Sequence, residues 1–164
     1  MYKLVATDMD ETFLDHDHQI PEANIRAMQR MKELGVLFVP SSGRWYSSIM
    51  DNFAHLDPAL LEGSYVISYN GGFINRVGDP NPLTSCGIGR ACAEELYALG
   101  RELGKCMHVN VADGHVFVCD APEAERTYLE KISGVTHFSS ADHTDLSFLD
   151  GRNIVKLIFM DPDF

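Results

Sequence analysis

The hydrophobic and polar positions along the chain form short apolar runs separated by longer stretches with a helical repeat. Between Pro21 and Gly35, apolar residues recur at intervals of three and four, and these two residues are typical helix boundaries. The runs that predict strands in this half of the chain are residues 4–6, 36–39 and 65–69. The first run fits a strand buried on both faces. A strand, a helix and a second buried strand predict parallel pairing through a right-handed crossover.

The composition changes after Ile74, and the second half of the chain has a different order of elements. Residues 76–89 are rich in glycine and proline and are expected to form a linker. Asp113-Gly114 lies between two β-rich runs and predicts a hairpin turn. The elements predicted in this half are a helix over 90–103, strands over 108–112 and 115–119, a helix over 122–132 and a strand over 153–160.

Two acidic residues, Asp8 and Asp10, follow the first predicted strand with one residue between them. At the carboxyl end of a buried strand, alternate side chains can face one crevice, where two carboxylates repel each other unless a hard cation such as Mg²⁺ lies between them. One carboxylate could bind metal and attack an electrophile while the other transfers protons, and Thr12 offers a hydroxyl to the same pocket. Acid pairs are also common in solvated turns, but the apolar strand before this pair favours a site.

A second polar segment follows the second predicted strand, where Ser42, Gly43 and Arg44 precede a predicted helix that contains Ile49 and Leu56. A hydroxyl, a permissive glycine, an arginine and exposed helix N–H groups together suit a phosphate oxygen. The alternative is an ordinary serine N-cap beside a surface arginine. The phosphate interpretation gains weight because this strand is expected beside the one that carries the acid pair.

The third strand-like run ends in Asn70, Gly71 and Gly72, a polar turn that we expect at the same edge of the sheet. Such a turn exposes backbone groups that a ligand could contact. Glycines in this position serve more often simply to turn the chain, so both interpretations stay open.

Histidines occur in two further candidate segments. His16 and His18 lie beside two acids within residues 15–20 and could bind a metal, but a flexible, solvated hairpin is the favoured interpretation. His108 and His115 flank the predicted hairpin turn and could face a substrate, but we expect them to be exposed hairpin residues.

Composition and charge narrow the classes of function. A chain of 164 residues with 45% hydrophobic content can bury one good core or two small ones. The formal charge of −11 argues against a nucleic-acid backbone as partner. Neither a membrane-spanning apolar run nor a secretion signal is indicated. The four cysteines have no C-x-x-C spacing, which favours reduced thiols in a cytoplasmic protein over a zinc or redox site.

Three segments together resemble the haloacid dehalogenase-like phosphatases, specifically the N-terminal part of the Cof-type branch. They are DMDETFL at 8–14, SSGR at 41–44 and SYNGG at 68–72. The first matches the family pattern D-x-D-x-T, with Glu11 where glycine is usual, and the second matches a Ser or Thr that commonly occurs within T-G-R. The resemblance implies an α/β fold, with part of a Rossmann-like parallel-sheet core in residues 1–80 and the first part of an inserted α/β cap domain in 81–164.

The resemblance also implies a role for each matched residue. Asp8 would be the nucleophile that forms an aspartyl-phosphate and a Mg²⁺ ligand, and Asp10 would bind Mg²⁺ through its backbone carbonyl and act as general acid, then base. Ser42 would hydrogen-bond the transferring phosphoryl group. Further candidate substrate-binding residues are Thr12, Gly43, Arg44, Asn70 and Gly71. The expected reaction is Mg²⁺-dependent hydrolysis of a small phosphorylated metabolite, such as a sugar phosphate.

By the same resemblance, a third motif (a lysine) and a fourth (an acidic cluster that completes the Mg²⁺ site) would follow the cap, beyond Phe164. We therefore expect a truncated form with low or no activity, whose exposed sheet edge could self-associate. The alternative is a non-catalytic remnant that binds phosphate or a partner.

Overall fold

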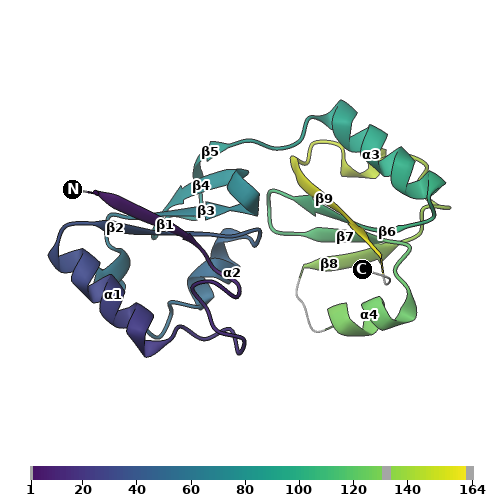
Figure 1. Ribbon diagram of the computed structural model, residues 1–164. Coiled ribbons are helices and arrows are strands. Elements are labelled where there is room, and N and C mark those ends of the chain that lie inside the picture. Colours follow the sequence, from purple (N-terminus) through teal and green to yellow (C-terminus); the bar gives the residue numbers. More distant parts are fainter. Residues whose placement is uncertain (1, 131–133, 162–164) are drawn as a thin grey trace. The chain divides into compact units, whose positions relative to one another are not determined.

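The computed structural model of the protein describes residues 2–130 and 134–161. The chain folds as two compact units, Met1–Cys86 and Gly87–Phe164, and each contains one sheet (Figure 1). Within the described residues, none of the helices combines the length and the hydropathy that crossing a membrane requires. The four cysteines are free thiols, two of them exposed and two buried.

The first unit contains a five-stranded sheet in the order β1-β2-β3-β4-β5 (Figure 1). The first three strands pair in parallel, whereas β4 and β5 pair antiparallel. The strands are β1 (Leu4–Asp8), β2 (Leu37–Ser41), β3 (Tyr65–Ser68), β4 (Phe73–Arg76) and β5 (Pro82–Ser85). The helices are α1 (Glu22–Glu33), α2 (Tyr46–Asp51) and the short 3₁₀ segments η1 (Pro58–Leu61) and η2 (Tyr69–Gly71). The predicted α/β class and the predicted parallel pairing are thus confirmed.

The two α-helices of this unit pack against one face of its sheet. Met28 of α1 and Ile49 of α2 are buried in one cluster with Phe38 of β2 and Val66 of β3. Phe13 joins the same cluster, with its ring centroid 4.6 Å from that of Phe38. Phe13 follows the acid pair in sequence, so its burial anchors the loop that carries the candidate catalytic residues.

The expectation that the first strand is buried on both faces is wrong. Leu4 and Val5 in β1 are 46% and 41% exposed. The physical reason is that β1 lies at the end of the strand order and pairs only with β2 among the described strands. A short apolar run gives no information about how many neighbours the strand has.

The segment expected to be a linker, residues 76–89, contains a strand. Within it, β5 pairs with β4 and extends the first sheet by one strand. All four residues of β5 are exposed. Because β5 has no buried apolar face, its sequence carries no hydrophobic alternation from which a strand could be predicted.

The second unit contains a four-stranded sheet in the order β8-β7-β6-β9, with helices on both of its faces (Figure 1). Its elements are α3 (Arg90–Glu102), β6 (Cys106–Val111), β7 (Val116–Cys119), α4 (Glu123–Leu129), β8 (Val135–Phe138), η3 (Ser147–Leu149) and β9 (Ile154–Met160). The antiparallel β6–β7 hairpin confirms the Asp113-Gly114 turn prediction. β8 was not predicted, and residues 131–132 of the predicted helix lie outside the described part of the chain.

The prediction that His108 is an exposed hairpin residue is also wrong. It is 9% exposed, and its Nε2 lies 3.0 Å from Oε1 of Glu125 in α4. Side chains of β6 alternate between two covered faces, and α4 covers the face on which His108 lies. His115 at the turn is about half exposed, as expected.

Candidate active site

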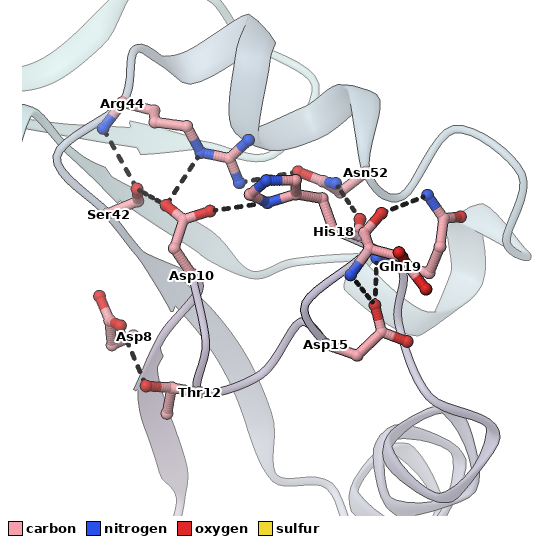
Figure 2. A network of polar contacts seen from close by, with 10 residues as sticks. Asp8, Asp10, Thr12, Asp15, His18, Gln19, Ser42, Arg44 and Asn52 are labelled. Atoms are coloured by element: carbon pink, nitrogen blue, oxygen red, sulfur yellow. Dashed lines mark hydrogen bonds and ion pairs between the residues drawn. The ribbon is translucent and has the colours of Figure 1, made fainter.

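The acid pair and the Ser-Gly-Arg segment leave the sheet at the same level. Asp8 ends β1 and Ser41 ends β2, and the two residues are direct partners in the parallel register. The loops that follow these strands therefore start side by side at the carboxyl edge of the sheet, the usual place for a ligand site in this kind of fold. Figure 2 shows the polar contacts that form there.

The loop after Asp8 is a tight turn built around one buried residue. The carbonyl oxygen of Met9 accepts hydrogen bonds from the N–H groups of Thr12, Phe13 and Leu14, at 3.3, 3.0 and 2.8 Å. The turn places Glu11 at φ 54°, in the left-handed region that glycine adopts at little cost. This is the position at which the family pattern has glycine, so the departure noted in the sequence places a side chain on a strained backbone.

Thr12 orients the first carboxylate of the pair. Its Oγ1 donates a hydrogen bond to Oδ2 of Asp8 at 3.1 Å. Both side chains are solvent-exposed, and the interaction fixes one carboxylate oxygen while the group remains open to a ligand. The predicted hydroxyl of Thr12 is therefore found beside Asp8, as the spacing of the motif suggested.

The second carboxylate, that of Asp10, faces the loop after β2 with one of its oxygens. Oδ2 of Asp10 lies 3.5 Å from Oγ of Ser42 and 3.4 Å from Nε of Arg44. Ser42 is buried, and Arg44 is 29% exposed. Three predicted residues from two separate motifs thus meet in space (Figure 2).

The interpretation of Ser42 as an ordinary helix cap is wrong. α2 begins at Tyr46, its N-cap is Trp45, and no side chain caps it. Oγ of Ser42 instead accepts a hydrogen bond from the backbone N–H of Arg44 at 3.2 Å. The hydroxyl proton therefore points away from this turn and is available to an acceptor on the Asp10 side.

Asn70 and its neighbour act through their backbone. The N–H of Asn70 donates to the carbonyl oxygen of Ser42 at 3.1 Å, and the N–H of Tyr69 donates to that of Arg44 at 3.0 Å. Tyr69, Asn70 and Gly71 all have positive φ angles, of 51°, 56° and 92°. This turn therefore holds the Ser42–Arg44 backbone in place, and Gly43 lies between the two anchored carbonyls.

Two residues at this site were not identified from the sequence. Nδ1 of His18 lies 3.6 Å from Oδ1 of Asp10, and Oδ1 of Asn52 accepts a hydrogen bond from Nη2 of Arg44 at 2.8 Å. From the sequence, the segment that contains His18 could bind a metal, but nothing in it indicated a contact with Asp10. Asn52 follows α2 and belongs to no recognised motif. Only the turn that folds His18 back toward Asp10 reveals the connection.

The oxygen donors at this site are of the type that Mg²⁺ prefers. The Asp8 carboxylate and the Asp10 backbone carbonyl are hard ligands, and the exposed Asp8 side chain is open to an ion. Over residues 2–130 and 134–161, no group of three or more His, Cys, Asp or Glu side chains is placed to hold a metal. Water or other groups would have to complete an octahedral shell around an ion held here.

Comparisons with known proteins give relatives in sequence and in structure. YxeH of Bacillus subtilis (strain 168), a protein named as a phosphatase, is 30% identical over 165 residues, which cover 98% of this chain and 58% of YxeH. Among solved structures, a haloacid dehalogenase-like hydrolase from B. subtilis has a TM-score of 0.72 at 18% identity, covering 97% of this chain and 61% of the other. BT1666 from Bacteroides thetaiotaomicron has a TM-score of 0.73 at 18% identity, covering 99% and 57%.

This chain thus spans less than two thirds of the length of each of these proteins. The sequence model of the haloacid dehalogenase-like hydrolases matches residues 5–163, nearly the whole chain. Together with the acid pair at the end of β1 and the serine and arginine beside it, this match shows that the chain belongs to the haloacid dehalogenase-like hydrolase family.

Proposed function

We propose that the protein is a Mg²⁺-dependent phosphatase that works through an aspartyl-phosphate on Asp8. The observation that carries the proposal is the placement of two carboxylates with different surroundings at one strand end. Asp8 is exposed and oriented by Thr12, which suits a nucleophile. Asp10 lies between His18 on one side and Ser42 and Arg44 on the other, which fixes the direction of its carboxyl group, as directed proton transfer requires.

In the first step, a carboxylate oxygen of Asp8 attacks the phosphorus atom, and the bond from phosphorus to the leaving oxygen breaks. The Asp10 carboxyl gives its proton to that leaving oxygen. In the second step, Asp10 takes a proton from water, whose oxygen attacks the phosphorus, and the bond between phosphorus and Asp8 breaks. Mg²⁺, when bound by the Asp8 carboxylate and the Asp10 carbonyl, supplies positive charge that reduces the repulsion between Asp8 and the phosphoryl oxygens.

Ser42 and Arg44 stand beside this reaction path. The hydroxyl of Ser42 accepts from the N–H of Arg44 and donates to Oδ2 of Asp10 over a long 3.5 Å contact, which a phosphoryl oxygen would replace as the acceptor. The guanidinium of Arg44 adds a positive charge on the same side, at 3.4 Å from Asp10. Gly43, Asn70 and Gly71 shape the loops from which these groups project.

The proposal extends to the division of labour in the chain. Residues 1–80 would form part of a Rossmann-like catalytic core, and residues 81–164 the first part of a cap that selects the substrate. The substrate would be a small phosphorylated metabolite such as a sugar phosphate, in the cytoplasm. The division into core and cap is supported by the position of all candidate catalytic residues in the first unit.

The test is hydrolysis of p-nitrophenyl phosphate and of a panel of sugar phosphates by the purified protein, with Mg²⁺ and with EDTA. We expect Mg²⁺-dependent turnover that Asp8→Asn abolishes without changing the circular dichroism spectrum. Asp57→Asn, a matched carboxylate in the same unit that caps η1, controls for loss of charge. Turnover that survives in Asp8→Asn, or that is unaffected by EDTA, contradicts the proposed chemistry.

A second candidate function is binding of phosphate without turnover. It is favoured by the small number of metal ligands that the described residues offer, because two protein donors leave Mg²⁺ largely hydrated. For the 164-residue chain by itself we therefore expect slow turnover at most. Calorimetric titration with inorganic phosphate distinguishes a phosphatase from a protein that only binds phosphate. Phosphate binding that is lost in Ser42→Ala, together with no turnover of any substrate tested, supports the binding function.

A further inference from the structure

We propose that His18 is a positioning residue for Asp10: its imidazole holds the Asp10 carboxylate in the orientation from which a proton reaches the leaving oxygen. The inference rests on the proposed function, because it assigns the role of proton donor to Asp10. It concerns a residue outside the three sequence motifs, in a segment for which the sequence favoured a solvated hairpin over a metal site.

The contacts of Asp10 form a clamp with two sides. Oδ2 faces Arg44 and Ser42, at 3.4 and 3.5 Å, whereas Oδ1 faces Nδ1 of His18 at 3.6 Å. The contact to Ser42 is a long hydrogen bond, whereas those to Arg44 and His18 are ion-pair contacts, and the His18 side chain is 69% exposed. Contacts of catalytic groups are often long before a substrate is bound and tighten in the complex. Without His18, the described contacts hold only one of the two carboxylate oxygens, and rotation of the side chain is no longer opposed from the other side.

His18 itself is tied to the opposite side of this clamp. Nδ2 of Asn52 donates to the backbone carbonyl of His18 at 3.1 Å, and Oδ1 of Asn52 accepts from Nη2 of Arg44 at 2.8 Å. The contacts therefore close a ring that runs from Asp10 to His18, Asn52, Arg44 and back to Asp10 (Figure 2). A ring of this kind fixes the histidine and the arginine relative to each other, so that the carboxylate between them has one preferred position.

The segment that presents His18 is a solvent-exposed turn, as expected, and hydrogen bonds within it define its conformation. Oδ1 of Asp15 accepts from the N–H groups of Asp17 and Gln19, at 3.0 and 2.9 Å. The N–H of Asp15 in turn donates to the carbonyl of Gln19 at 2.9 Å. Within this turn His18 has φ 57°, a conformation that costs free energy in a residue with a side chain. A strained backbone that aims a side chain at a candidate catalytic carboxylate is typical of functional positions.

The chemical consequence depends on the leaving group. An alkoxide is a strong base and leaves only as it takes up a proton, so its departure requires a correctly directed Asp10 carboxyl. The p-nitrophenolate anion leaves without a proton, so its departure is insensitive to the orientation of Asp10. Because kcat/KM reports the steps up to release of the alcohol, it isolates this difference from the later hydrolysis of the aspartyl-phosphate.

The kinetic test compares kcat/KM for glycerol 2-phosphate and for p-nitrophenyl phosphate in three variants. We expect His18→Ala to lower the value for the alkyl ester about tenfold and to change that for the aryl ester less than about twofold. His18→Asn should restore most of the loss, because its amide N–H occupies the place of Nδ1 and asparagine tolerates a positive φ. His16→Ala, in the same turn and 88% exposed, is the matched control and should change neither value.

A second measurement does not depend on turnover. Three-bond NMR couplings of the isotopically labelled 164-residue protein report the χ1 rotamer of Asp10, and we expect one rotamer in the wild type and in His16→Ala and averaging in His18→Ala. An unchanged Asp10 rotamer in His18→Ala, or an equal loss with both esters, overturns the inference. These outcomes are distinct from failure of the proposed function, which would appear as turnover that persists in Asp8→Asn.

Discussion

Asp8 and Ser41 are register partners at the ends of two adjacent parallel strands. Their alignment means that the residue two positions after Asp8 and the residue directly after Ser41 leave the sheet together, which brings Asp10 within 3.5 Å of Ser42. A shift of one residue in the register between β1 and β2 would reverse the faces on which these side chains lie. The site thus depends on strand pairing as much as on the identity of its residues.

Ser42→Ala should slow phosphatase turnover by roughly ten- to a hundredfold, because one hydrogen bond to a charged phosphoryl group is worth about 1.5–3 kcal/mol. The measurement is kcat/KM with p-nitrophenyl phosphate. Ser41→Ala is the matched control, since Ser41 lies in β2 and, within the described part of the chain, it is the neighbouring Ser42 that hydrogen-bonds Asp10. Equal effects of the two substitutions would mean that Ser42 has no special role.

Glu11→Gly should stabilise the fold. A side chain at φ 54° costs about 1–2 kcal/mol, and the larger backbone entropy of glycine in the unfolded chain offsets about 0.5–1 kcal/mol of the gain. A net increase of about 0.5–1 kcal/mol in the free energy of unfolding is expected from urea titration. Glu11→Ala keeps the strained Cβ and should give no such increase. If alanine stabilises as much as glycine, repulsion between Glu11 and the neighbouring acids is the cause, and not the backbone.

The second unit should lose stability as the pH falls below neutrality. Burial lowers the pKa of His108 below its usual 6.5, and the neighbouring Glu125 only partly opposes this shift. The unfolded chain therefore takes up the proton first, so stability that is present above pH 6.5 is lost as the pH falls toward the pKa of the folded state. We expect the urea midpoint to drop between pH 7.5 and 5.5 by more in the wild type than in His108→Gln. His115→Gln, at an exposed position, should retain the full pH dependence of the wild type.

Two of the four thiols should react slowly. Burial is the main cause that raises the pKa of Cys106 to about 11 and that of Cys119 to about 12, so neither forms much thiolate at pH 8. Cys86 and Cys92 are exposed. Titration with a disulfide reagent such as DTNB should show two fast thiols in the folded protein and all four after denaturation. Replacement of Cys86 and Cys92 by serine should remove the fast phase, and a fast phase that persists would show that the second unit opens readily.

The sequence was sufficient to predict the elements that carry strong apolar signals. The helical repeat after Pro21 corresponds to α1, and the three apolar runs correspond to β1, β2 and β3. The parallel order of these strands then placed Asp8 and Ser42 at one edge, which is why their proximity could be predicted before the structure was known.

What was missed depends on tertiary neighbours. β5 has no buried face, the four residues of β8 are at most partly buried, and the exposure of β1 reflects the absence of a second neighbour among the described strands. His108 looked like a hairpin residue because nothing in its own segment indicates that α4 covers it. The role of His18 was missed because its segment lacks apolar periodicity, and its turn is determined by the hydrogen bonds that Oδ1 of Asp15 accepts from the backbone N–H groups of Asp17 and Gln19.

The boundary between Cys86 and Gly87 separates two sets of hydrophobic clusters, and every residue of the acid-pair site lies before it. The described contacts of Asp8 and Asp10 are accordingly made by residues of the first unit. Evolution can therefore change side chains of the second unit while the residues of this site in the first unit stay the same. Chimeras that exchange the second unit between relatives of this fold should be joined between Cys86 and Gly87.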